Sequence, residues 1–210
     1  MKIFTNEDLI NCTKFDVKGL NFFIKLINID EKETKNIKYI YNISKKLPAS
    51  IRGYHGGYAG GLYDHMLLVT NIAYHNYILT DPKKINEMNN KTNNYDLTDL
   101  IKASMYHDFG KVDHYTQMKN ISFKFKSESR NLKYVRYMIQ KDYNIRGKDV
   151  HVERCFVVIR NASLTINDNI QVGIIFHHGG WSKYYPQKSN KSIYAILHAA
   201  DMIASQFYGV

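Results

Sequence analysis

The chain has 210 residues, of which 44% are hydrophobic and 13% aromatic, a composition typical of a folded globule and unlike that of a disordered chain. Its 29 Lys and Arg residues outnumber its 19 Asp and Glu residues, and the net charge of +10 favours phosphate-rich partners without separating nucleic acids from nucleotides. Two cysteines exclude a disulfide framework and no apolar run nears the roughly 20 residues of a membrane span, so we expect a reduced, cytoplasmic protein without a membrane partner.

Helical patterns dominate the first half of the chain. Residues 31–47 place apolar side chains at helical spacing and stop before Pro48, because the residue before a proline disfavours the helical conformation. The glycine-rich stretch "YHGGYAGG" (54–61) predicts a loop, and a helix is expected over residues 62–79. The polar run 83–94 indicates an exposed loop or a short helix.

The next helix leads to an unusual pair of side chains in the sequence "HDFGK". It begins at Asp96 or Thr98, either of which can cap it, and it ends at Tyr106 or His107. Gly110 suits a left-handed cap after the helix. An imidazole and a carboxylate therefore lie side by side at a helix end, where both can turn toward a bound cation.

The remainder of the chain predicts more helices and one short strand. "ISFKFK" (121–126) alternates like a strand and leaves room for one short β-hairpin, whereas "ESRNLKYVRYMIQKDY" (128–143) has the pattern of a helix. Further helices are expected over residues 149–162, 168–178 and 190–207, the last with a clear apolar stripe. No repeat or linker marks a domain boundary, so the sequence predicts a single all-α bundle.

Nine histidines are present, and several lie beside helix ends or glycines. Asp201 lies within an apolar helix, where an unpaired carboxylate is costly to bury unless a cation or hydrogen bonds offset its charge. His75, His114 and His198 have no such context and are expected to be ordinary structural histidines. The residues that this context singles out are His65, His107, Asp108, His151, His177, His178 and Asp201, although each one taken alone is also compatible with an ordinary structural role.

Four ordered blocks, "GGLYDHMLLV", "YHDFGK", "IIFHHGG" and "AILHAADMIAS", resemble the signature blocks of the HD superfamily of metal-dependent phosphohydrolases. The resemblance covers residues 52–207 and implies one HD-type domain over residues 1–210, with 1–50 as an N-terminal helical extension. The family pattern H…HD…D falls on His65, His107, Asp108 and Asp201.

Two groups within the superfamily are similar to this chain. "YHGGYAGGLYDH" and "FHHGGW" resemble the HD domains of YhaM-type exoribonucleases and also a set of phage and bacterial HD proteins, which match the spacing better. Proteins of the second group often have Asp where this chain has His178, so either His177 alone or both histidines would be ligands. A phage origin would place the protein in the host cytoplasm.

The resemblance implies one or two divalent ions in the site. Imidazoles mixed with carboxylates suit Mn²⁺, Fe²⁺, Co²⁺ or Zn²⁺ better than Mg²⁺. The four residues of the H…HD…D pattern would hold the first ion. A second ion, or the substrate, would be held by His151 and His177, with His178 as a further candidate.

Three more residues are candidates for contact with the substrate. Lys111 matches the family's lysine after the HD pair and is expected to face the substrate phosphate. Asp108 is expected to act as a ligand and also to orient the attacking water. Arg52 and His55, in or beside the glycine-rich loop, are candidate phosphate contacts.

The function expected is hydrolysis of a nucleotide phosphate ester by metal-activated water, as a nucleotidase or a nucleoside triphosphohydrolase. One alternative is a phosphodiesterase or nuclease on RNA, DNA or a cyclic nucleotide, which the positive charge favours. The other is a catalytically silent protein that binds a nucleotide or a partner. Metal-supplemented activity would separate the two enzyme functions from the silent one.

Overall fold

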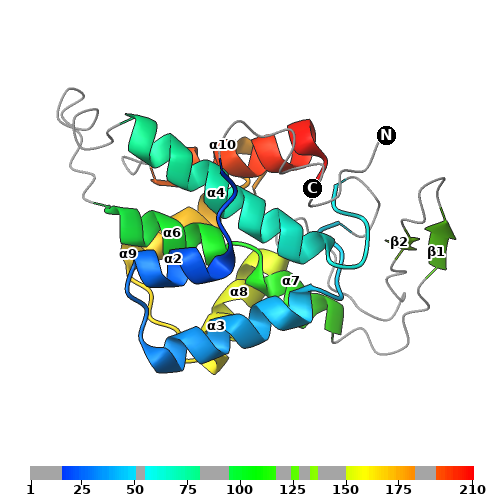
Figure 1. The fold of residues 1–210 in the computed structure, drawn as a ribbon, viewed down its shortest axis with the longest axis horizontal. Helices are drawn as coiled ribbons and strands as arrows, with labels where there is room; N and C mark the ends of the chain where they lie inside the picture. Colours follow the sequence, from blue (N-terminus) through cyan, green and yellow to red (C-terminus); the bar gives the residue numbers. More distant parts are fainter. Residues whose placement is uncertain are drawn as a thin grey trace.

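The computed structural model describes residues 16–50, 55–80, 95–116, 124–127, 133–136, 150–182 and 193–210, and its fold is all-α, as the sequence predicts (Figure 1). A short 3₁₀ helix, η1 (Gly179–Trp181), follows α9, and a π-helical turn, η2 (Ile203–Tyr208), follows α10. The α-helices are α2 (Leu20–Leu26), α3 (Glu31–Ser44), α4 (Gly61–Thr80), α6 (Leu97–Tyr106), α7 (Phe109–Thr116), α8 (Val150–Asn161), α9 (Asp168–Phe176) and α10 (Ile193–Met202).

Side-chain caps start three of these helices. The Asp30 carboxylate accepts a hydrogen bond from the backbone N–H of Glu33 at 2.9 Å at the start of α3. Asp96 does the same for α6, which settles the choice between Asp96 and Thr98. Asn167 caps α9 through the N–H of Ile170 at 3.0 Å. Each cap satisfies a backbone donor that has no partner inside its own helix.

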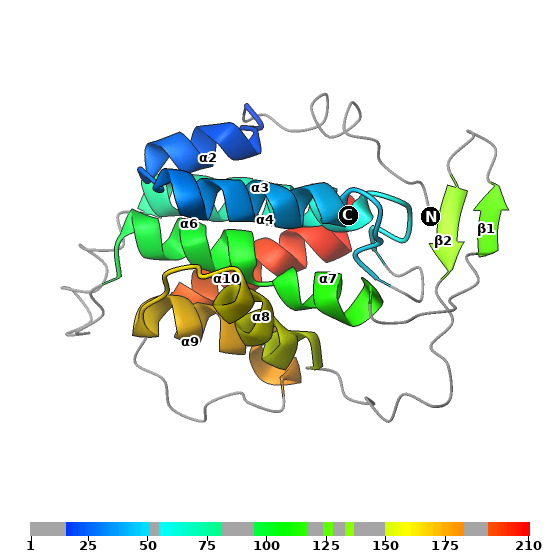
Figure 2. The same ribbon diagram turned by 90° about the horizontal axis from the view of Figure 1, so that it is seen from below.

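Helix α4 contacts α3, α6, α10 and the turn η2. It packs against α6 on one side and α10 on another, while α9 packs against both α6 and α10 (Figures 1 and 2). Helices α7 and α8 form the closest pair of neighbours in the structure. The C-terminal ends of α6 and α9, at His107 and His177, therefore lie near α4 and α10.

A continuous apolar core holds this arrangement. Removing such side chains from water provides the main stabilisation of a helical bundle.

None of the described helices is long and apolar enough to cross a membrane. Many of their apolar side chains lie in the core. The largest fully buried side chains include Phe23, Ile37, Tyr41, Leu62, Met66, Leu100, Met105, Tyr106, Phe109 and Ile174.

The structure also contains one antiparallel pair of short strands. β1 (Lys124–Ser127) pairs with β2 (Lys133–Arg136), with Lys124 opposite Arg136. The strand expected near 121–126 is thus present, but the helix expected over 128–143 is wrong at β2. The two apolar residues of β2, Tyr134 and Val135, are adjacent, so the sequence there does not distinguish a strand from part of a helix. The polar segment 83–94 lies outside the described residues.

Candidate metal centre

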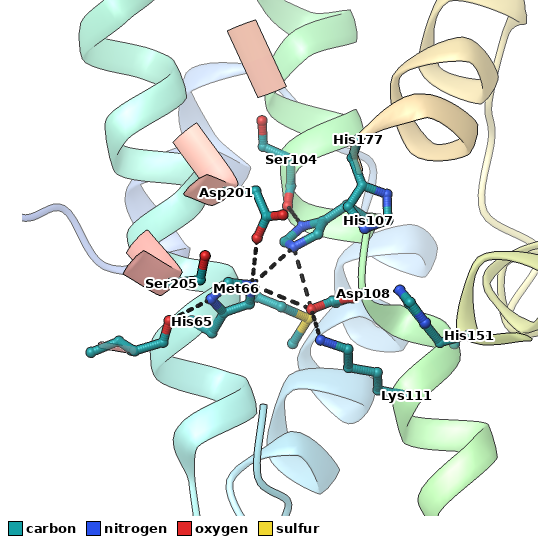
Figure 3. Close-up of polar contacts among 12 residues, drawn as sticks. His65, Met66, Ser104, His107, Asp108, Lys111, His151, His177, Asp201 and Ser205 are labelled. Atoms are coloured by element: carbon teal, nitrogen blue, oxygen red, sulfur yellow. Dashed lines mark hydrogen bonds and ion pairs between the residues drawn. The ribbon is translucent and has the colours of Figure 1, made fainter. Parts of the chain in front are cut away.

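Four side chains from three places in the sequence converge in the interior of the bundle. His65 comes from α4, His107 and Asp108 from the turn between α6 and α7, and Asp201 from α10 (Figure 3). Their polar atoms point toward one another in Figure 3. We call these four residues the primary cluster.

The distances in the primary cluster are those of direct contact. His65 Nε2 lies 3.1 Å from Asp201 Oδ1 and 3.4 Å from Asp108 Oδ2. His107 Nε2 lies 3.4 Å from Asp108 Oδ2 and also 3.4 Å from His65 Nε2. The side chains of His65, His107 and Asp108 are almost fully buried. Two imidazole nitrogens and two carboxylates thus share one site, in which Asp201 is partly exposed.

Main-chain carbonyls fix the orientation of three histidines at the site. A carbonyl oxygen can only accept a hydrogen bond, so the Nδ1 atom that contacts it must carry the proton. This leaves Nε2 as the atom presented to the site, the arrangement found around metal-ligating histidines. The pairs are His65 with Val210 (2.8 Å), His107 with Ser104 (2.7 Å) and His177 with Ile174 (2.7 Å).

The charges of the primary cluster balance one another. Burial would lower the pKa of His65, but its hydrogen bonds to Asp108 and Asp201 outweigh burial and raise that pKa to about 9. Burial would raise the pKa of Asp201, but His65 lowers it below its usual value. Without a cation the cluster therefore holds an imidazolium between carboxylates, a place that a divalent ion can take.

Lys111 completes this balance. It lies one turn after Asp108, and its Nζ is 2.6 Å from Asp108 Oδ2. Burial would raise the pKa of Asp108, but Lys111 and His107 hold it well below its usual range. Asp108 is therefore an anion at neutral pH, and Lys111 is a buried cation within reach of any group that binds beside it.

A second group of ligands lies on the other side of Asp108. His151 from the start of α8, His177 from the end of α9, and His178 after it form what we call the histidine cluster. Their candidate ligand atoms all lie within 4.8 Å of one another. His151 Nε2 also lies 3.4 Å from Asp108 Oδ1, so the two oxygens of one carboxylate face the two clusters.

The histidine cluster and the oxygen of Asp108 that faces it include buried polar atoms without a hydrogen bond to any described residue. Burial lowers the pKa of His151 and of His177 well below the usual value, so both imidazoles are neutral at pH 7. Among the described residues, Asp108 Oδ1, His151 Nε2 and His177 Nε2 are buried and lack a hydrogen bond. Leaving such atoms without hydrogen bonds costs free energy, and a bound cation could take up the free lone pairs of His151 and His177.

Close packing between α7 and α8 joins the two clusters. Gly110 lies inside α7 and has no positive φ, so it is not the left-handed cap expected from the sequence. A Cβ atom there would lie 1.7 Å from the His151 carbonyl oxygen. Cys155 Sγ accepts from the Gly110 N–H at 3.1 Å and donates to the His107 carbonyl at 2.9 Å. The glycine is needed for contact with α8.

His198 supports the end of α9, a role that the sequence did not reveal. Its Nδ1 donates to the His177 carbonyl at 2.7 Å. Gly179 has φ +56, and a Cβ on it would lie 2.6 Å from the His198 ring. The one signal available in the sequence was the spacing of three residues between His198 and Asp201, which places both on one face of α10.

The loop before α4 brings a further histidine, His55, to the site. The ring of His55 lies 5.0 Å from that of His65, and burial lowers its pKa to about 3. Its Nε2 is buried and has no hydrogen bond within the part of the chain that the structure describes. His55 is thus neutral and faces the primary cluster. Arg52, the other candidate on this stretch, lies outside the described residues.

The structure therefore brings the candidate residues of the sequence together around Asp108, and their donor atoms fit a divalent ion. The mixture of imidazole nitrogens and carboxylate oxygens suits Mn²⁺, Fe²⁺, Co²⁺ or Zn²⁺. No protein-family model matches the chain, and comparison with curated proteins and with solved structures found no match. Three overlapping groups of described residues could hold a metal: His65, His107 and Asp201; His107, Asp108 and His177; His151, His177 and His178.

Proposed function

We propose that the chain is a metal-dependent phosphohydrolase of the HD superfamily that hydrolyses a phosphate ester of a nucleotide. The observation that carries this proposal is the Asp108 carboxylate, whose Oδ2 faces the primary cluster and whose Oδ1 faces the histidine cluster. A carboxylate shared in this way is suited to a pair of ions. The ordered H…HD…D blocks of the sequence support the same assignment.

The residues at the site have distinct parts in the proposed reaction. A bound divalent ion would lower the pKa of a water molecule and offset negative charge on the phosphate. Asp108, kept ionised by Lys111 and His107, would serve as a ligand and orient the attacking water through a carboxylate oxygen. Lys111 provides a buried positive charge for a phosphate oxygen that displaces Asp108 from its Nζ.

His55 contributes a neutral contact rather than a charge. With a pKa of about 3 it is not protonated at neutral pH, so it can donate one hydrogen bond and accept another. Its place beside His65 suits it to a phosphate or sugar oxygen of the substrate. Main-chain hydrogen bonds hold its loop, with the Ala49 N–H donating to the Gly56 carbonyl at 2.8 Å.

A second candidate function, hydrolysis of phosphodiesters in RNA, DNA or cyclic nucleotides, is favoured by the net charge of +10. Such a charge attracts polyanions over a range limited by salt. The charge attracts nucleotides as well, so it does not separate the two functions. We rank the nucleotide function first because the sequence contains no recognised nucleic-acid-binding module. A silent binding function is disfavoured because the chain keeps all four residues of the H…HD…D pattern at one site, and a protein that only binds a nucleotide or a partner has little need of a metal site.

The test is an activity screen of the purified chain with Mn²⁺, Fe²⁺, Co²⁺, Zn²⁺ or Mg²⁺ added one at a time. The substrates are deoxynucleoside mono- and triphosphates, cyclic nucleotides and short RNA, with Asp108→Asn as the negative control. Release of phosphate from a mononucleotide or triphosphate supports the proposal. Cleavage restricted to cyclic nucleotides or RNA favours the second function. Nucleotide binding without turnover under every metal contradicts both enzyme functions.

A further inference from the structure

One segment of the chain contacts both nitrogens of the His65 ring. Asp201 Oδ1 lies 3.1 Å from Nε2, and the carbonyl oxygen of Val210 lies 2.8 Å from Nδ1. Both partners lie on the stretch from Asp201 to Val210. The His65 ring is therefore held from both sides by one ten-residue segment. Its first residue contacts Nε2, which faces the site, and its last residue contacts Nδ1.

The backbone of this segment explains how it turns back to His65. The π-helical turn η2 follows α10, and such turns are concentrated at functional sites. Gly209 then adopts φ +73, a left-handed conformation that glycine takes without strain. The Val210 N–H donates to the Ala204 carbonyl at 3.1 Å, and the Val210 side chain is fully buried. The direction of the Val210 carbonyl is therefore fixed.

The preceding carbonyl holds a different part of the site. The Gly209 carbonyl oxygen accepts a hydrogen bond from the Gly56 N–H at 2.9 Å. Gly56 follows His55, the neutral histidine that faces the primary cluster. Two successive carbonyls thus hold a candidate ligand and the loop of a candidate substrate contact.

We propose that Gly209 and Val210 form a positioning element that sets the orientation of His65 and the place of the His55 loop. This inference rests on the proposed function in that His65 is a metal ligand. The Val210 carbonyl keeps the proton on Nδ1, so the lone pair of Nε2 faces the ion. Loss of such an outer partner typically weakens metal binding about 10- to 100-fold, although it touches no metal.

The test compares two variants that both lose the two buried methyl groups of Val210. A chain ending at Gly209 lacks the Val210 carbonyl, whereas Val210→Ala keeps it. We expect Mn²⁺ affinity to fall about 10- to 100-fold in the shortened chain and far less in Val210→Ala. Isothermal titration with Mn²⁺ measures both, and circular dichroism checks that each variant is folded. Equal affinities in the two variants would overturn the inference.

A second measurement needs neither metal nor activity. In nuclear magnetic resonance spectra of the metal-free full chain, the His65 Nδ1 proton and the Gly56 amide proton should exchange slowly with water. In the chain ending at Gly209, the His65 proton should exchange rapidly while the Ile170 amide of the α9 cap stays unchanged. Rapid exchange of the His65 proton in the full chain would overturn the inference even if the shortened chain fails to fold.

These readouts separate the inference from the function on which it rests. Protected protons in a full chain that binds no divalent ion would refute the metal site and leave the positioning role intact. Tight Mn²⁺ binding that both variants retain would refute the positioning role and leave the metal site intact.

Discussion

The primary cluster and the histidine cluster share Asp108 but differ in charge. In the primary cluster, His65 has a pKa of about 9 and lies between two carboxylates. In the histidine cluster, burial lowers the pKa of His151 and His177, and their Nε2 atoms have no hydrogen bond among the described residues. The first cluster holds a proton where a metal would go, whereas the second offers lone pairs.

Because of this difference, the affinity for the same metal ion should depend on pH in one cluster more than in the other. A metal that enters the primary cluster must displace the proton on His65, so its affinity depends on pH. A metal in the histidine cluster would bind imidazoles that are already neutral, so protons would compete less with it for the ring nitrogens. The shared carboxylate couples the two, because each of its oxygens serves one cluster.

The largest effect is expected from Asp108→Asn, because it removes the charge shared by both clusters. Hydrolysis should fall about 1,000-fold or more, and binding of both ions should weaken. Kinetics and metal analysis of the purified variant check this. Asp113→Asn, a carboxylate on α7 that pairs with Arg154 at 2.8 Å, is the matched control and should stay active. Full activity of Asp108→Asn would end the proposed function.

The next effect separates the clusters. His177→Ala should remove one ion of two and leave the primary ion in place, since His177 is absent from the group of His65, His107 and Asp201. Activity should drop roughly 100-fold, because two ions together stabilise the attacking and leaving oxygens. Metal content per chain is the measurement, with His75→Gln as the histidine control. One ion in both wild type and His177→Ala would refute the second site.

A smaller effect follows from the pKa of His65. Because folding and its carboxylate partners raise this pKa from 6.5 to about 9, the metal-free site keeps its proton at neutral pH. Metal affinity of the primary cluster should therefore rise about tenfold per pH unit and level off above pH 9. Mn²⁺ titrations of His177→Ala, which isolates the primary ion, measure this slope. A flat profile across that range would contradict the charge difference between the clusters.

The raised pKa of His65 has the opposite effect on the stability of the metal-free fold. A raised pKa stabilises the folded, metal-free chain fully below about 6.5, and this contribution disappears as pH rises through about 9. Metal binding and metal-free stability should thus change in opposite directions over one pH range. Thermal unfolding with and without Mn²⁺ compares them directly.

The sequence predicted the fold class and the candidate ligands because both depend on local patterns. Helical periodicity predicted an end of α6 at Tyr106 or His107, and the structure ends the helix at Tyr106 with His107 as its C-cap. Residue type alone did not mark His65 or Asp201 as ligands, because a single histidine or aspartate in a helix usually has an ordinary structural role. The resemblance of the four ordered blocks to the HD superfamily implied that these residues meet His107 and Asp108 at one site, and the structure brings the four side chains together.

The rest of the site depends on contacts between distant segments. The Val210 carbonyl belongs to the main chain, and every residue has one, so no residue type could mark it. Gly110 was predicted as a cap because its real constraint, the His151 carbonyl of α8, lies 41 residues away in the chain. The helix predicted across β2 failed for the same reason, since pairing with β1 decides its conformation.

The smallest effect tests how the histidine cluster depends on α8. Cys155 joins α8 to the turn of His107 and Asp108, through its bonds to the Gly110 N–H and the His107 carbonyl. Cys155→Ala should lower the free energy of unfolding by about 1–3 kcal/mol, because it leaves buried groups unpaired. Cys155→Ser keeps a donor and an acceptor and should recover part of that loss.

Binding of the two ions should respond unequally to this change. His151 lies on α8 and moves with it, whereas His65 and Asp201 lie on α4 and α10. Cys155→Ala should therefore weaken the second ion more than the first, and Cys155→Ser should restore the second. Stepwise Mn²⁺ titration of both variants, alongside denaturant unfolding, resolves the two ions. Equal weakening of both ions would mean that the turn of His107 and Asp108 itself has shifted, because that turn is the part of the site that serves both clusters.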